Sequence, residues 1–185
     1  MNDIFQYWES KIAKEPEPLL VEAGFLRSYI CFEEFMRDIF ISFSLGKNYK
    51  SYTPSRSLCF NSENQLMEVI RGEASFVDYY KAIERCSKHI FTQDPFPIVF
   101  SDSCFSQPLL QMRVLRNYLA HRSAESKERY ISKVLSSYGF SENLEPGDFL
   151  LRKMKNGTVT YYNHYMEVLR RAHSALTDEA ILKGN

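Results

Sequence analysis

The residues best suited to chemistry lie in one short segment, Leu109 to Ser123, which reads LLQMRVLRNYLAHRS. Its polar side chains of interest are those of Arg113, Arg116, Asn117, His121 and Arg122. A guanidinium can donate two parallel hydrogen bonds to phosphate oxygens. An imidazole titrates near neutrality and can therefore accept or donate a proton at cellular pH. Together these residue types indicate chemistry on a phosphodiester.

A helix over this segment would place four of the five residues on one side. Each residue of a helix turns by about 100°, so Arg116 lies about 60° to one side of Arg113. Asn117 and His121 lie about 40° and about 80° to the other side, which gives an arc of about 140°. Asn117 and His121 are four residues apart, the spacing at which helical side chains meet. The long side chain of Arg116 can reach the same point, so we expect the three side chains to converge.

The run from Arg116 to His121, RNYLAH, consists of an arginine, a polar residue, three further residues and a histidine. No other Arg–His pair in the chain has this spacing. The pattern resembles the signature of the HEPN superfamily. The wider runs LRNYLAHRSAESKERY and FLRSYICFEEFMRDIF are most similar to its RiboL-PSP-HEPN branch. The resemblance implies a single HEPN-like helical domain over residues 1–185, with a helical layout that matches from about Leu19 to Leu176.

The resemblance also implies an activity and its partners. Active HEPN proteins are metal-independent endoribonucleases, common in bacterial toxin–antitoxin and antiphage systems, and they generally dimerise with two motifs facing each other. By this analogy Arg116 and His121 are catalytic, and Asn117 orients His121 or contacts the phosphate. Arg113 and Arg122 either bind RNA or are solvated charges. The expected partners are RNA, a second copy of the chain and an antitoxin or defence-system protein, and no metal or cofactor is expected.

In the implied reaction, His121 removes the proton of a ribose 2′-hydroxyl, which then attacks the adjacent phosphorus. Arg116 holds the phosphate and stabilises its developing charge. Each copy offers one His121, so the second copy would protonate the leaving 5′-oxygen. One HEPN subgroup, regulated by a nucleotidyltransferase, carries a modifiable tyrosine two places after the histidine, where this chain has Ser123. The alternative is a HEPN-like bundle without activity that serves as an RNA-binding or protein-interaction module.

Composition limits the remaining classes. Lysine plus arginine and aspartate plus glutamate number 23 each, so the net charge is zero and RNA binding requires a local basic patch. The four cysteines form no C-x-x-C pair and no zinc-ligand spacing, which favours free thiols in a reducing compartment. The first residues, MNDIFQYWESK, are not typical of a signal peptide, and no apolar run is long enough to span a bilayer. We therefore expect a cytoplasmic protein without membrane contact.

Hydrophobic periodicity predicts an all-α, up-and-down bundle of four to five main helices. Helices are expected at about residues 1–15, 19–45, 62–71, 75–91, 106–123, 126–138 and 161–182. Capping patterns at Ser62, Ser75 and Ser106 mark three of the starts. Residues 47–60 and 92–104 are expected to be loops, the second because of Pro95 and Pro97.

Residues 140–160 leave two possibilities open. The Pro146–Gly147 pair indicates a turn, and the Asn156–Gly157 pair between FLLRKMK and TVTYY is a hairpin signal. A small β-hairpin at about 148–160 is therefore possible beside the helices. An α+β domain would require this hairpin to grow into a sheet, and no other segment has a strand pattern.

Overall fold

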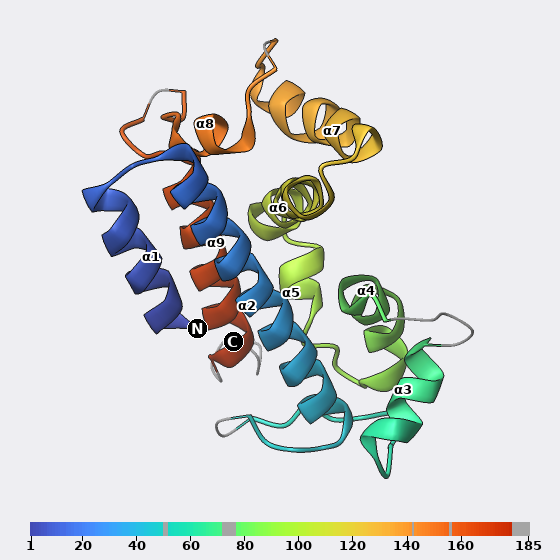
Figure 1. The fold of residues 1–185 in the computed structure, drawn as a ribbon. Coiled ribbons are helices and arrows are strands. Elements are labelled where there is room, and N and C mark those ends of the chain that lie inside the picture. The colour runs from blue at the N-terminus through green and yellow to red at the C-terminus, as the bar shows by residue number, and fades with distance from the viewer. Residues whose placement is uncertain (50–51, 72–76, 142, 156, 179–185) are drawn as a thin grey trace. The chain divides into compact units, whose positions relative to one another are not determined.

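A computed structural model describes residues 1–49, 52–71, 77–141, 143–155 and 157–178. Within these ranges the chain is helical, with isolated β-bridges and no named strand, so the predicted all-α helical bundle is confirmed (Figure 1). The helices are α1 (Asn2–Lys14), α2 (Pro18–Ser44), α3 (Glu63–Arg71), α4 (Tyr79–Ile90), α5 (Pro97–Phe100), α6 (Ser103–His121), α7 (Ala124–Tyr130), the π-helix η1 (Ile131–Leu135), the 3₁₀-helix η2 (Ser136–Tyr138), α8 (Pro146–Leu151) and α9 (Tyr161–Thr177). In the described residues no helix is both long and apolar enough to span a bilayer.

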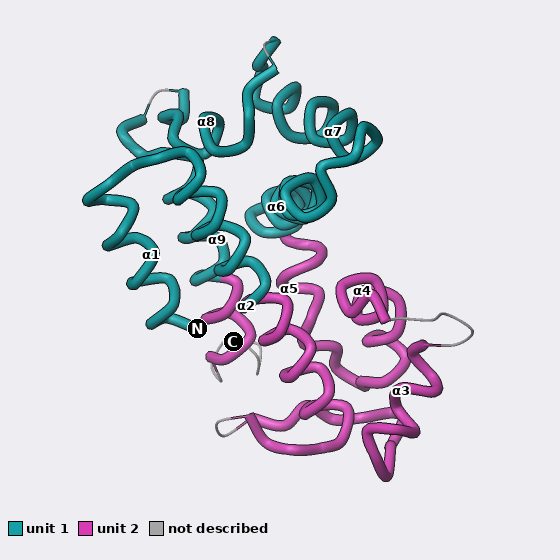
Figure 2. The backbone as a smooth tube through the Cα atoms, in the orientation of Figure 1, with its two compact units in different colours: residues 1–31, 103–171 teal, residues 32–102, 172–185 magenta. Residues whose placement is uncertain are grey.

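The chain divides into two compact units (Figure 2). Unit 1 consists of residues 1–31 and 103–171, and unit 2 consists of residues 32–102 and 172–185. Helices α2 and α9 each contribute residues to both units. The assignment of all 185 residues to one HEPN-like domain stays a prediction.

Unit 1 contains α1, the first part of α2, α6 to α8 and most of α9. Helix α1 lies directly on α2 at Gly24, where an added Cβ would lie 2.9 Å from the Cδ1 of Ile12. Arg170 of α9 forms an ion pair with Glu9 of α1, which joins these two helices. An aromatic cluster fills the interior, in which the rings of Phe149 and Tyr161 stack with centroids 4.5 Å apart. The same cluster reaches α7, because the ring of Tyr130 contacts that of Phe149 and stacks on Tyr118 of α6, the helix that carries four of the five candidate residues.

Unit 2 is built around a phenylalanine cluster. The rings of Phe40, Phe43, Phe91 and Phe96 are fully or almost fully buried, and their centroids lie 5.8–6.4 Å apart where they touch. Helices α3 and α4 pair beside it, where a side-chain nitrogen of Arg85 donates to a backbone oxygen of α3 at 3.1 Å. Unit 2 therefore has its own apolar core.

Several helix boundaries differ from the sequence-based expectation. Helix α6 begins at Ser103 instead of Ser106, so Pro108, expected in the first turn, lies inside the helix. Residues 97–100, expected in a loop, form the single turn α5 with Pro97 at its first position. Helix α4 begins after Asp78, whose side chain accepts from the Lys81 amide at 3.2 Å. The expected start at Ser75 lies outside the described residues, as does the predicted end of the last helix near residue 182.

The segment between α7 and α9 also differs. Pro146 is the first residue of helix α8 and not part of an isolated turn, as its fixed φ suits a helix start. The possible hairpin is reduced to one isolated antiparallel bridge between Lys153 and Thr160. Residues 124–138 form a helix, as expected, but they pass through a π-helical stretch before Gly139 ends them in the left-handed conformation.

Candidate functional site

Helix α6 presents the candidate residues on the side away from its buried face. That buried face consists of Phe105, Leu109, Gln111, Met112, Leu115 and Tyr118. Arg113, Arg116 and Asn117 are half-buried, and His121 is exposed at the last position of the helix. The spacing of apolar residues thus positions the four polar side chains as the helical geometry predicts.

Arg116 and Asn117 are joined directly. The Nη1 of Arg116 donates to the Oδ1 of Asn117 at 3.1 Å, and the Nε of Arg116 is buried. A half-buried guanidinium held by a neighbouring amide has less rotational freedom than an exposed one. The sequence suggested that Asn117 orients His121 or contacts the phosphate, which stays a prediction; in the structure its side-chain oxygen accepts from Arg116. The expected convergence of all three side chains is therefore seen for Arg116 and Asn117.

Helix α6 ends because Arg122 adopts the left-handed conformation, with φ of +49°. Among the described residues no other non-glycine has a positive φ. The backbone amide of Arg122 donates to the backbone carbonyl oxygen of Tyr118 at 2.9 Å, which closes the last turn around His121. Ser123 then caps α7, because its Oγ accepts from the Ser126 amide at 3.2 Å. The chain changes direction immediately after His121.

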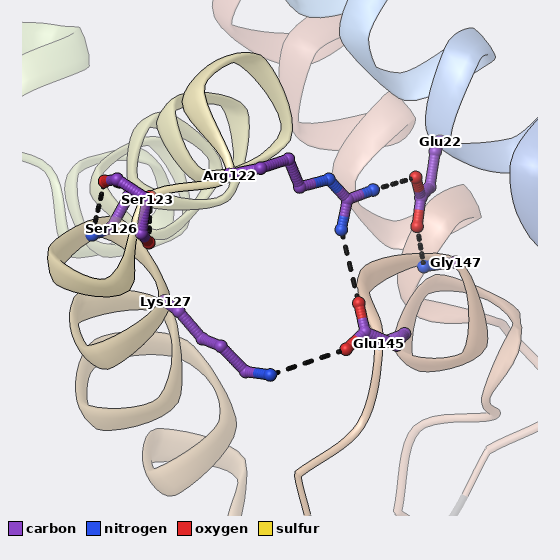
Figure 3. A network of polar contacts seen from close by, with 7 residues as sticks. All are labelled: Glu22, Arg122, Ser123, Ser126, Lys127, Glu145 and Gly147. Atoms are coloured by element: carbon purple, nitrogen blue, oxygen red, sulfur yellow. Dashed lines mark hydrogen bonds and ion pairs between the residues drawn. The ribbon is translucent and has the colours of Figure 1, made fainter.

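The Arg122 guanidinium lies in a network of charges (Figure 3). It forms ion pairs with Glu22 of α2 and with Glu145, which precedes α8, the latter at 3.2 Å. Lys127 of α7 also approaches Glu145, at 3.7 Å, and the second oxygen of Glu22 accepts from the Gly147 amide at 3.0 Å. We call Glu22, Arg122, Lys127 and Glu145 the junction network. It connects the starts of α2 and α8 to the turn between α6 and α7.

Tyr118 contributes an aromatic surface to the same turn. The Arg122 guanidinium carbon lies 5.1 Å from the Tyr118 ring centroid, and that ring stacks on Tyr130 at 5.2 Å. Although partial burial lowers the pKa of Arg122, contact with Tyr118 and the carboxylates of Glu22 and Glu145 raises it overall. Burial also raises the pKa of Tyr130 far above its usual range. Arg122 was predicted to bind substrate or to be a solvated charge, and its guanidinium is committed to two carboxylates of its own chain.

A second polar network joins α6 to the 3₁₀-helix η2. Gln111 is 4% exposed, and its Nε2 donates to the Oγ of Ser137 at 2.7 Å. The Tyr138 hydroxyl donates to the Oε1 of Gln111, also at 2.7 Å. We call Gln111, Ser137 and Tyr138 the buried network. Gln111 and Arg122 are thus each the centre of a polar network.

The sequence analysis did not identify Glu22 or Glu145 as neighbours of the motif. They lie 100 and 23 residues from Arg122 along the chain, and no local pattern links them. The glycine at position 147 was the one sequence feature that pointed to a close contact there. In the structure an added Cβ at Gly147 would lie 2.5 Å from the Pro18 carbonyl oxygen. A glycine directly after a proline at a helix start is compatible with such a close backbone approach.

The other histidines lie in different surroundings. His89 is exposed on α4, and the ring of His173 lies 4.5 Å from that of Phe35. His164 is half-buried, and burial lowers its pKa. A surface cavity of about 440 Å³ in unit 1 is lined by Asp3, Ile4, Tyr7, Trp8 and Arg27 and includes none of the candidate residues. The described part of the chain contains no cluster of three or more histidine, cysteine or acidic side chains that could hold a metal.

No family model, no curated protein and no solved structure matches this chain.

Proposed function

We propose that the chain is a metal-independent endoribonuclease of the HEPN type, acting as a toxin or an antiphage-defence effector. The observation that carries the proposal is the arrangement on α6, where the Arg116 guanidinium is fixed by Asn117 and the exposed His121 follows at the helix end. Arg116 and His121 are five positions apart, which corresponds to about one and a half helical turns, or a rise of about 7.5 Å. Long side chains at that separation can contact one phosphodiester from two sides.

The proposed reaction is a phosphoryl transfer within the RNA strand. His121 accepts the 2′-hydroxyl proton, and the 2′-oxygen forms a bond to phosphorus while the bond to the 5′-oxygen breaks. The leaving 5′-oxygen takes a proton from His121 of a second copy. Arg116 donates hydrogen bonds to the phosphate oxygens as negative charge accumulates. The products are a 2′,3′-cyclic phosphate and a 5′-hydroxyl, and no metal is required.

The electrostatic surroundings support an anionic substrate. Two carboxylates, those of Glu22 and Glu145, lie at the turn that follows His121, where they would repel a phosphate. Arg122 and Lys127 pair with them, so the junction network is neutral as a whole. Arg113 and Arg116 are the other two basic side chains on this side of α6, in a chain whose net charge is zero.

The test compares RNA cleavage by the wild type and by His121→Ala in the presence of EDTA. General acid–base catalysis typically contributes about 10²–10⁴-fold, so we expect cleavage to fall by at least about a hundredfold. Arg116→Ala should cause a similar loss. His89→Ala is the matched control, because it removes an exposed histidine from another helix. Helical circular dichroism should be unchanged in all three variants. Cleavage that persists in His121→Ala would exclude this role, and a wild type that binds RNA without cutting it would indicate the inactive module.

Dimeric catalysis has its own test. If each phosphodiester needs His121 from two copies, a mixed dimer of wild type and His121→Ala is inactive. Adding an excess of His121→Ala to a fixed amount of wild type should then lower cleavage in proportion to mixed-dimer formation. Adding the same excess of His89→Ala should raise the cleavage rate, because that variant keeps His121. If the excess of His121→Ala leaves the cleavage rate of the wild type unchanged, one copy carries out both proton transfers.

A further inference from the structure

The left-handed turn at Arg122 is unusual because it lacks a glycine. Helices commonly end with a residue in this conformation, and glycine is preferred there because a Cβ is unfavourable at positive φ. Arg122 nevertheless adopts it, directly after His121. Such a conformation persists only where surrounding contacts hold it. The contacts that hold this one are therefore important for the end of α6.

Those contacts come from three directions. Glu22 of α2 and Glu145 before α8 bind the two terminal nitrogens of the guanidinium (Figure 3). The guanidinium also lies over the ring of Tyr118. Glu22 is itself fixed, because its side chain is 12% exposed and its other oxygen accepts from the Gly147 amide. At least one of the two carboxylates that bind Arg122 is thus itself held in place.

This anchoring affects His121 through the backbone. The last turn of a helix frays unless its free carbonyl groups find partners. Here the backbone amide of Arg122 donates to the backbone carbonyl oxygen of Tyr118 at 2.9 Å, and the turn that this bond closes contains His121. If Arg122 lost its anchors, the turn could open or continue as helix, and the direction of the imidazole would change.

We propose that Arg122 is a positioning residue, whose bridge between Glu22 and Glu145 fixes the turn after α6 and so sets the direction of His121. The effect on catalysis rests on the proposed nuclease function, whereas the effect on His121 geometry does not. A direct contact of Arg122 with RNA is the competing explanation. It would require the guanidinium to leave two carboxylates.

The test uses two substitutions that remove the guanidinium but differ in backbone preference. Arg122→Gly suits the left-handed conformation, and Arg122→Ala does not, so the glycine variant should melt at a higher temperature. Both variants should nevertheless lose turnover at saturating RNA, by roughly ten- to a hundredfold, as expected for a misplaced catalytic group. A merely structural role would make the losses follow the melting temperatures instead.

Arg129→Ala is the matched control. It removes another arginine of the same unit, from an exposed ion pair with Glu125 at 2.7 Å. Its turnover should equal that of the wild type. Arg122→Lys keeps the charge but can bind only one carboxylate at a time, so it should recover part of the turnover. If both Arg122→Ala and Arg122→Gly cleave at the wild-type rate, or if only KM rises, the proposal is wrong.

A second measurement does not depend on cleavage. The side-chain NMR signals of His121 should shift in Arg122→Ala and Arg122→Gly, and they should stay in place in Arg129→Ala. If the wild type does not cleave RNA, the proposed function fails, and these signals alone decide whether Arg122 positions His121. Unshifted His121 signals in both Arg122 variants would overturn the positioning role whatever the activity.

Discussion

Two polar networks of different kinds hold helix α6 and the turn that ends it. The buried network around Gln111 consists of neutral groups, in which Gln111 is buried, Tyr138 is half-buried and Ser137 is exposed. The junction network around Arg122 consists of charges, and the Arg122 side chain is 43% exposed. Neutral buried hydrogen bonds are expensive to break, whereas exposed ion pairs contribute little to stability. The first network therefore stabilises the fold, and the second serves mainly to define the geometry beside His121.

The largest expected difference is in stability. Gln111→Ala removes a buried side chain and leaves the Tyr138 hydroxyl without its acceptor, so we expect a loss of about 2–4 kcal/mol. Urea unfolding monitored by circular dichroism measures this loss. Gln107→Ala, an exposed position on the same helix, is the control and should change stability by less than about 0.5 kcal/mol. Similar losses at both positions would show that the buried network does not hold the helix pair.

The next difference is in how the stability contributed by each network changes at alkaline pH. Burial raises the pKa of Tyr138 above the usual value of about 10. The folded protein then holds the proton that the unfolded chain loses, so the stabilisation is complete below about pH 10 and decreases as the pH rises. The slope reaches at most about 1.4 kcal/mol per pH unit for one tyrosine. Guanidinium groups keep their charge in this range, so the ion pairs of Arg122 with Glu22 and Glu145 are unaffected.

Tyr138→Phe makes this effect specific. At neutral pH the variant should be less stable than the wild type, because a donor to Gln111 is missing. Above about pH 10 the difference should narrow, because ionisation of Tyr138 favours the unfolded state of the wild type and phenylalanine has no proton to lose. Urea midpoints at a series of pH values measure both proteins. A constant difference up to the alkaline unfolding limit would contradict the pKa shift.

A smaller effect is expected at the junction network. Arg122→Ala removes two partly exposed ion pairs and a cation–π contact, which together contribute about 1 kcal/mol. Arg122→Gly removes the same contacts but relieves the left-handed backbone, so it should be more stable than Arg122→Ala by up to about 1 kcal/mol. Thermal unfolding of the two variants provides the comparison. A glycine variant less stable than the alanine variant would show that the turn is not held in this conformation.

The two networks also show what the sequence could and could not predict. Periodicity located α2, α6 and α9 because each has a long apolar face, which is a local property. The helical angles likewise placed Arg113, Arg116, Asn117 and His121 on one side of α6, where they lie half-buried or exposed. Both results depend only on residues close together in the chain.

The rest depends on contacts between distant residues. Glu22 reaches Arg122 because α8 packs against the start of α2 at Gly147, and nothing near Arg122 in the sequence encodes that approach. For the same reason the pairing of Asn117 with Arg116, instead of His121, could not be chosen from spacing alone. The π-helical stretch after α7 was also missed, since its side chains follow an ordinary helical pattern.

The smallest effect separates the networks by their response to salt. Between about 0.1 M and about 1 M salt the Debye length falls from about 10 Å to about 3 Å, which weakens exposed ion pairs. The stability difference between wild type and Arg122→Ala should therefore shrink by a few tenths of a kcal/mol. The difference between wild type and Gln111→Ala should stay constant, because neutral buried hydrogen bonds are not screened. Chemical denaturation with urea, which adds no ions, measures both differences. A salt-independent Arg122 difference would mean that its contribution comes from the Tyr118 contact and the backbone turn, and not from Glu22 and Glu145.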